Sequence, residues 1–177
     1  GKPLPSIRCD NNIKKDINNK PIKIIDTPLI YAGDTNDNKI NNYCDEIMEY
    51  YKYEVDNNNY NPNDFLIIFP IMKKNVIASE LQNKIQDYWL EKEDPNNDTY
   101  IQYAYLHKHT EGTVINTKDS INSTRIMSIR SAKGDGRKVT FVLGVTEDTL
   151  KIVSNKQIGI VYESYLHVAL TRSKNQI

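Results

Sequence analysis

Two short segments of the chain contain residue types that can contact a phosphate group. The first, residues 128–134, reads Ser-Ile-Arg-Ser-Ala-Lys-Gly, so hydroxyl groups, cations and a glycine follow one another closely. Glycine allows a ligand to approach the backbone. Basic residues concentrate in and beside this segment, against a single nearby carboxylate, that of Asp135; they are Arg125, Arg130, Lys133, Arg137 and Lys138. The segment therefore indicates either an anion-binding loop or a solvated basic turn, because charge alone does not distinguish the two.

The second segment, residues 165–172, is an apolar stretch that ends in Thr171 and Arg172. A packed helix can hold an arginine at its end rigidly and direct it toward a ligand. The alternative is an arginine that only interacts favourably with the carboxyl end of the helix dipole. Taken alone, this segment favours neither interpretation decisively.

Apolar runs predict the strands that would position these segments. Continuous apolar runs at 65–69 and 139–144 are typical of strands buried on both faces of a parallel sheet. Further strands are expected at 100–106 and 125–129, separated by a polar loop or a hairpin, with short strand-like segments between 22 and 30. The last residues before Ile177 are expected to enter one more strand.

Apolar residues at helical spacing predict the helices. One helix is expected after Asp37 as its N-cap, ending at the asparagine run 57–59. A second carries Ile77, Leu81, Ile85, Tyr88 and Trp89 on one face and ends within 91–98, and a third spans 158–170. Alternating strands and helices indicate the α/β class, with a mostly parallel sheet covered by helices on both faces.

Together, and in this order, the two segments resemble motifs V and VI of superfamily 1 helicases of the UvrD/RecD-like kind. Those helicases show a Thr-x-His-Ser-Ala-Lys-Gly loop before an apolar strand, and then a Tyr-Val-Ala-x-Thr-Arg segment. This chain has the loop 128–134 before the run 139–144, and then His-Val-Ala-Leu-Thr-Arg at 167–172. The run 65–69 with its following helix is similar to motif IV, so the resemblance covers approximately residues 21–177. It implies the second, C-terminal RecA-like (P-loop NTPase-type) domain of a helicase, cut near its last strand, after a lead-in or linker at 1–20.

The chain departs from the family pattern at several positions. Pro70 stands where the family often has an arginine after the motif IV strand, and Lys73 and Lys74 follow a little later as substitutes. Arg130 replaces the motif V histidine, and Asp135-Gly136 replaces a Leu-Glu pair, which leaves Asp135 for contact with the nucleotide ribose. Only a few dozen residues, 91–124, occupy the place where UvrD-type helicases insert a large domain, so the layout is closer to the RecD-like branch.

The resemblance implies ATP, with Mg²⁺, between this domain and a first RecA-like domain of the same polypeptide. Arg172 would be the catalytic arginine finger, and the nucleotide side would also include Lys133, Gly134, Asp135 and Thr171. Single-stranded DNA would contact this domain mainly through its phosphates, at Ser128, Arg130, Ser131, Arg137, Lys73 and Lys74. These residues are expected to belong to an ATP-dependent DNA helicase of replication or repair.

The phosphate cradle that such an enzyme needs is absent from this sequence. No Gly-x-x-x-x-Gly-Lys-Ser/Thr motif occurs, and Asp45-Glu46 lies inside a predicted helix instead of ending an apolar strand. The cradle and the magnesium ligands are therefore expected upstream, and this domain alone is expected to be inactive. Two alternatives stay open: the matching domain of a superfamily 1 RNA helicase, and a nucleotide-independent nucleic-acid-binding module with a RecA-like shell. A Walker A lysine upstream would argue against the second.

Composition limits the remaining interpretations. The 177 residues suit one domain, and the formal net charge of zero leaves nucleic-acid binding to a local patch. No membrane span or signal peptide is evident, and Cys9 and Cys44 lack metal-type spacing. His107 and His109 lack a third ligand, and Tyr100, Tyr103 and Tyr105 are expected to pack on a strand rather than stack on bases. An intracellular protein of the cytoplasm, nucleus or a viral replication site is expected.

Overall fold

The computed structural model describes residues 36–93, 101–107, 120–132, 134–155 and 160–176. The lead-in expected at 1–20 and the short strands expected between 22 and 30 lie outside these residues. So do Cys9, Tyr100, His109 and Lys133 among the side chains considered above.

Among the described residues, five parallel strands form one sheet, in the order β2-β3-β1-β4-β5. They are β1 (Phe65–Phe69), β2 (Ala104–Leu106), β3 (Thr124–Ser128), β4 (Arg137–Val142) and β5 (Ser173–Gln176). β1 is central, and Ile67 lies between Ile126 of β3 and Phe141 of β4. The sequence-based strands at 65–69, 125–129 and 139–144 are confirmed to within a few residues. The hairpin alternative is wrong, because Tyr105 pairs with Arg125 in a parallel ladder.

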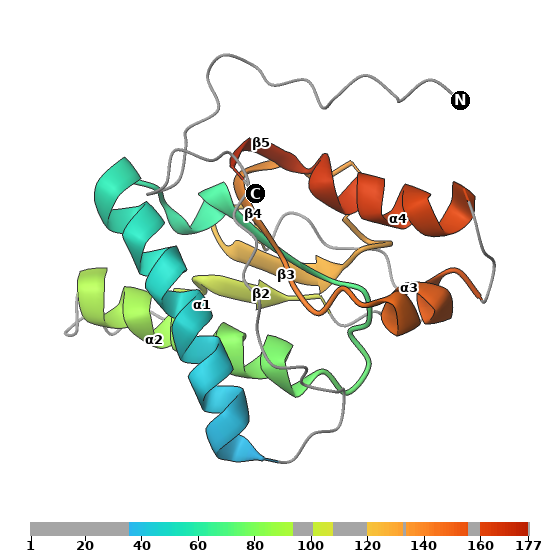
Figure 1. Ribbon diagram of the computed structural model, residues 1–177. Coiled ribbons are helices and arrows are strands. Elements are labelled where there is room, and N and C mark those ends of the chain that lie inside the picture. The colour runs from blue at the N-terminus through green and yellow to red at the C-terminus, as the bar shows by residue number, and fades with distance from the viewer. Residues whose placement is uncertain (1–35, 94–100, 108–119, 133, 156–159, 177) are drawn as a thin grey trace.

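Helices cover both faces of the sheet (Figure 1), which confirms the predicted α/β class and is consistent with a RecA-like domain. α1 (Asp37–Asn58) and α2 (Val76–Glu93) pack on one face, and α3 (Glu147–Val153) and α4 (Ile160–Leu170) on the other. A single 3-10 turn, η1 (Pro62–Asp64), precedes β1.

The residues of β1 alternate between two cores. Phe65, Ile67 and Phe69 point into the core under α1 and α2, whereas Leu66 and Ile68 point into the smaller core under α3 and α4. Successive strand residues face opposite sides of a sheet, so a fully apolar strand supplies both cores at once. This is why the run 65–69 reads as continuously apolar.

The helix boundaries differ from the sequence-based ones in two places. The N-cap of α1 is Asn36, whose side chain accepts the backbone N–H of Lys39, and Asp37 is already helical. The short helix α3 is an addition to the predicted elements, since its few residues show no clear periodicity; a capping box between Thr146 and Thr149 begins it. At the other end of α1, Asn59 adopts the left-handed conformation, with φ 52°.

The connection from β3 to β4, residues 129–136, shows no helix in its described residues. It leaves the carboxyl end of β3 and enters the amino end of β4, and β1 lies between these two strands. Ile129 and Ala132 are both fully buried in the core beneath α3 and α4. The segment, which we call the crossover, therefore passes over β1 on that face. Most parallel connections use a helix for this purpose.

Tyr51 joins the helical layer to the sheet at the centre of the larger core. Its ring is fully buried and lies 4.1 Å from the ring of Phe65. Its hydroxyl accepts from Nε1 of Trp89 on α2 at 2.9 Å and lies 2.7 Å from Oγ1 of Thr124 on β3. Thr124 in turn donates to the carbonyl of Pro62, so Tyr51 is the donor to Thr124. Burial raises the pKa of Tyr51 and keeps this donor protonated.

Tyr51→Phe should lower the free energy of unfolding by about 1–3 kcal/mol, because it leaves the buried Nε1–H of Trp89 without an acceptor and removes the hydrogen bond donated to Thr124 Oγ1. Urea unfolding of the wild type and the variant measures this difference. Tyr53→Phe on the half-buried side of the same helix is the control, expected within about 0.5 kcal/mol of wild type. Equal losses of stability in the two variants would contradict the assigned role of the Tyr51 hydroxyl.

Candidate functional site

The predicted site residues divide between the two edges of the sheet. Ser128, Arg130 and Ser131 follow the carboxyl end of β3, and Lys73 and Lys74 follow the carboxyl end of β1. Because Phe69 and Ser128 are paired in register, these two groups of residues share the carboxyl edge. In open α/β sheets, the carboxyl ends of strands are where ligands bind.

The remaining predicted residues meet at the amino edge. Asp135 and Arg137 precede or begin β4, while Thr171 and Arg172 immediately precede β5. The backbone N–H of Arg137 donates to the carbonyl of Arg172 at 3.2 Å. The residues just after the first motif-like segment therefore meet the end of the second at this edge, and Gly134, the last residue of the first segment, lies one residue before Asp135.

At the carboxyl edge, side chains of the crossover fix its first turn. The hydroxyl groups of Ser128 and Ser131 are 2.9 Å apart, and the backbone N–H of Ser131 donates to Ser128 Oγ at 3.2 Å. Between them, the exposed Arg130 donates to the carbonyl of Val153 at the end of α3. Its guanidinium carbon lies 5.8 Å from the ring centre of Tyr165 on α4. Arg130 thus rests against both helices of that face.

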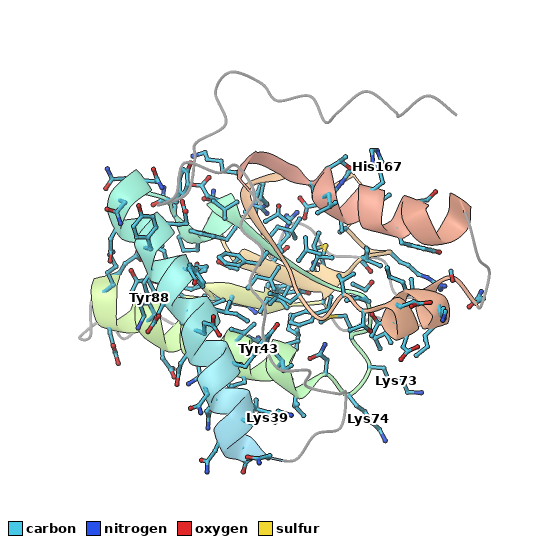
Figure 2. The ribbon with its side chains drawn as sticks, in the orientation of Figure 1. Lys39, Tyr43, Lys73, Lys74, Tyr88 and His167 are labelled. Atoms are coloured by element: carbon cyan, nitrogen blue, oxygen red, sulfur yellow. The ribbon has the colours of Figure 1, made fainter. Side chains whose placement is uncertain are left out.

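Lys73 and Lys74 are exposed in the loop between β1 and α2. Figure 2 shows both side chains extending outward from the domain. Lys74 adopts the left-handed conformation, with φ 54°. Among the described cations that the sequence assigned to nucleic acid, these lysines are exposed, as is Arg130, whereas the side chain of Arg137 is largely covered.

Arg172 is half-buried at the end of α4. Its Nε donates to the carbonyl of Val168 at 3.0 Å and its Nη2 to the hydroxyl of Thr171 at 3.2 Å. This is the geometry of an arginine on the last turn of a helix, where cations interact favourably with the dipole. Within the described part of the chain, no carboxylate forms an ion pair with Arg172. Its charge is therefore held in place but not neutralised by those residues.

Asp135 lies between two largely buried arginines. Its Oδ2 is 2.7 Å from Nη1 of Arg125, and its Oδ1 is 3.6 Å from Nε of Arg137. Arg125 also donates to Ser120 Oγ at 3.0 Å, and Arg137 donates to the carbonyl of Asn63. Burial, and then the charge of Arg125, lower the pKa of Arg137. We call Arg125, Asp135 and Arg137 the arginine–aspartate cluster.

The structure corrects the expectation of one basic site with a single carboxylate. Arg130 lies at the carboxyl edge, while Arg125, Arg137 and Lys138 lie at the amino edge. A second carboxylate, Asp64, pairs with Lys138 at 3.0 Å. Only 12% of the Arg137 side chain is exposed, so this predicted nucleic-acid contact is mostly covered in the domain. The residues are close in sequence, but the crossover carries them to opposite ends of the strands.

A cavity of about 390 Å³ opens at the amino edge. It is lined by residues from four separate stretches of the chain, namely Asn63, Asp64, Ile121, Arg125, Asp135, Gly136, Arg137 and Lys138. Sequence reasoning missed Asn63, Asp64 and Ile121, since only the parallel register brings the starts of β1, β3 and β4 together. Gly134, beside it, has φ +90°, and an added Cβ would meet no heavy atom within 4 Å. Backbone conformation, rather than close packing, therefore favours glycine there.

Other residues considered from the sequence have structural roles. Tyr103 is buried against Trp89 and donates to Glu93, as the packing interpretation predicted. Cys44 is buried, and burial raises its thiol pKa to about 12. The residues that the structure describes hold no group of three or more His, Cys, Asp or Glu side chains arranged to bind a metal ion. Among these residues, too, no helix has the length and the apolar character needed to cross a bilayer.

His107 is a buried histidine beside the arginine–aspartate cluster. Its Nε2 has no hydrogen-bond partner among the described residues, and its ring lies 4.7 Å from that of Tyr105. Burial lowers the pKa of His107, and the charge of Arg125 lowers it further. The folded domain therefore favours the neutral imidazole.

Acid should destabilise the domain partly through His107. Below the ordinary histidine pKa of about 6.5, the unfolded chain takes up a proton that the folded chain resists, so the free energy of unfolding falls. His107→Gln should therefore lose less stability than wild type between about pH 7 and about pH 5. Thermal unfolding across this range is the measurement, with His167→Gln, an exposed position, as control. Parallel pH profiles for wild type and His107→Gln would refute this linkage.

Comparison with known proteins gives no match to a family model, to a curated protein or to a solved structure.

Proposed function

We propose that this chain is the C-terminal RecA-like motor domain of an ATP-dependent superfamily 1 DNA helicase. The observation that carries the proposal is the hydrogen bond from the Arg137 N–H to the Arg172 carbonyl. It joins Arg137, three residues after the motif V-like segment, to the last residue of the motif VI-like segment. A nucleotide phosphate at this edge could therefore contact both segments together.

Arg172 forms no ion pair with a carboxylate among the described residues, which suits the role of an arginine finger. ATP bound with Mg²⁺ between this domain and a first RecA-like domain would supply the phosphoryl group that is transferred to water. The guanidinium of Arg172 would stabilise the charge that develops in that step. Its present hydrogen bonds, to Val168 and Thr171, are partly solvent-exposed and are each worth only about 0.5–1.5 kcal/mol. Charge-assisted bonds to phosphate oxygens are stronger and can replace them.

The crossover supports coupling between nucleotide and nucleic acid. It follows Ser128 at the carboxyl edge and leads into Arg137 at the amino edge, next to Arg172. One continuous and largely anchored segment thus connects the proposed DNA side with the proposed ATP side. When the two domains open and close around ATP, the contacts that this domain makes with single-stranded DNA would then shift along the DNA.

Surface charge favours a path for single-stranded DNA along the carboxyl edge of the sheet. α1 and α2 both carry more carboxylates than cations, so their outer face repels a polyanion. The exposed Lys73 and Lys74 and the hydroxyl groups of Ser128 and Ser131 offer phosphate contacts at that edge. Such contacts are independent of sequence and weaken as salt rises. The same proposal implies an intracellular protein whose partners are single-stranded DNA and the first RecA-like domain.

Arg172→Ala in the polypeptide that carries both RecA-like domains should lower the turnover of single-strand-stimulated ATP hydrolysis by roughly 10³ to 10⁵. DNA affinity should change little, because the finger acts mainly in the transition state. Arg172→Lys should rescue poorly, since an ammonium group lacks the planar fork. Steady-state ATPase assays and DNA titrations test this, with Lys92→Met on α2 as control. Turnover of Arg172→Ala within about tenfold of wild type, or ~1.4 kcal/mol, would contradict the proposal.

Lys73→Ala combined with Lys74→Ala should weaken single-stranded DNA binding and flatten its salt dependence. The slope of log K against log salt should fall by roughly 0.7 for each phosphate that the variant no longer neutralises. Fluorescence anisotropy at several salt concentrations measures it. The matched control removes the same charge from the acidic helical face, by Lys52→Ala with Lys92→Ala. If the two double variants change the slope equally, single-stranded DNA does not follow the carboxyl edge of the sheet.

A further inference from the structure

The arginine–aspartate cluster holds the last residues of the crossover. The exposed fractions of the side chains are 9% for Arg125, 17% for Asp135 and 12% for Arg137. Each carboxylate oxygen of Asp135 faces a different guanidinium group. A carboxylate shared in this way, and largely screened from water, is held more firmly than one in an exposed ion pair.

Each arginine of the cluster is itself fixed to a different element. Arg125 lies on β3 and donates to Ser120 as well as to Asp135. Arg137 lies on β4 and donates to the carbonyl of Asn63 in η1. Asp135 thus ties the end of the crossover to the starts of three neighbouring strands.

The cluster is one hydrogen bond from Arg172. The N–H of Arg137 donates to the Arg172 carbonyl, and the backbone N–H of Asp135 donates to the carbonyl of Ala132, which closes the turn around Gly134. Moving Asp135 would therefore move both the Gly134 turn and the residue that supports the Arg172 backbone.

From this geometry we infer that Asp135 is a positioning residue, which fixes the Gly134 turn and, through Arg137, the backbone of Arg172. The inference rests on the proposed function, because it assigns Asp135 a role in placing the proposed arginine finger. It differs from the sequence-based expectation that Asp135 contacts the nucleotide ribose. Both oxygens of this carboxylate already face guanidinium groups, and the ribose contact is not needed to explain the residue.

Removing the Asp135 charge alone does not distinguish a role in positioning Arg172 from a role in the stability of the domain. Asp135→Asn leaves two largely buried guanidinium groups facing each other without their shared counter-charge, so it should destabilise the domain whatever its role. Arg125→Met combined with Asp135→Asn removes both charges of the Arg125–Asp135 ion pair, the shorter of the two ion pairs of Asp135. It leaves no buried, unpaired charge at position 125 and should recover much of the stability.

The test compares Asp135→Asn, Arg125→Met and the double variant in the complete protein, at a temperature where all are folded. Measurements are thermal stability, residue-level hydrogen exchange of the Arg137 amide, and kcat and KM for single-strand-stimulated ATP hydrolysis. If Asp135 is a positioning residue, the double variant should regain thermal stability but not the turnover of ATP hydrolysis. Its kcat should stay roughly 100-fold low with KM nearly unchanged, and its Arg137 amide should exchange about tenfold faster, since a looser Arg172 contact opens more often. Lys92→Met, which breaks the ion pair with Asp56, should resemble wild type in all three measurements.

Recovery of turnover together with stability in the double variant would overturn the inference and leave Asp135 a structural residue. Unchanged exchange at the Arg137 amide would also overturn it, and this measurement does not depend on ATP hydrolysis. A failure of the proposed function looks different. In that case Arg172→Ala keeps its turnover, whereas a failure of positioning alone leaves Arg172→Ala impaired and the double variant active.

Discussion

The arrangement of this domain depends on a geometric constraint at the crossover. β3 and β4 are parallel and lie on either side of β1, so the chain must return along the length of β1, roughly 17 Å, without a helix to cover the distance. The segment makes this return through two turns, one closed by the N–H of Ala132 on the carbonyl of Ser128 and one by the N–H of Asp135 on the carbonyl of Ala132. Its backbone polar groups cannot all be paired within the segment, and buried ones must find partners elsewhere. Ile129 meets this need at the start, where its N–H donates to the carbonyl of Phe69.

The same constraint explains where polar and charged side chains are buried. Within the crossover, Ile129 and Ala132 are the apolar side chains fully buried among the described residues, whereas polar contacts hold both ends. At one end Ser128 and Ser131 share a hydrogen bond, and at the other Asp135 is held by two arginines. Burying an ion pair is costly and contributes little net stability compared with apolar packing. The arginine–aspartate cluster therefore serves mainly to hold the last residues of the crossover in one conformation, and contributes less to the stability of the domain.

This geometry gives the proposed motor domain a direct connection between its two ligand sides. The exposed lysines after β1 and the first turn of the crossover lie at the carboxyl edge, and Arg172 lies at the amino edge. Arg130 adds a second connection, because it contacts both Val153 on α3 and Tyr165 on α4, the helix that ends two residues before Arg172. Nucleic acid and nucleotide would thus act on a common set of packed elements. Under the proposed function, that is what coupling ATP hydrolysis to movement along a strand requires.

The sequence by itself determined the type of fold and most of its elements, with the short helix α3 as the exception. The run 65–69 is apolar at every position because β1 supplies both cores, and the periodic apolar positions of α1 and α2 identify the faces they bury. It also contained the order of the two motif-like segments, which is the basis of the proposed function. Only the tertiary structure decided which of their residues lie together. Arg130 and Arg137 are close in sequence but lie at opposite edges, whereas Arg137 and Arg172 are distant in sequence and share a hydrogen bond. The physical reason is that local propensity and periodicity act over a few residues, while strand order, parallel register and the path of a helix-free connection are set by long-range packing of the sheet.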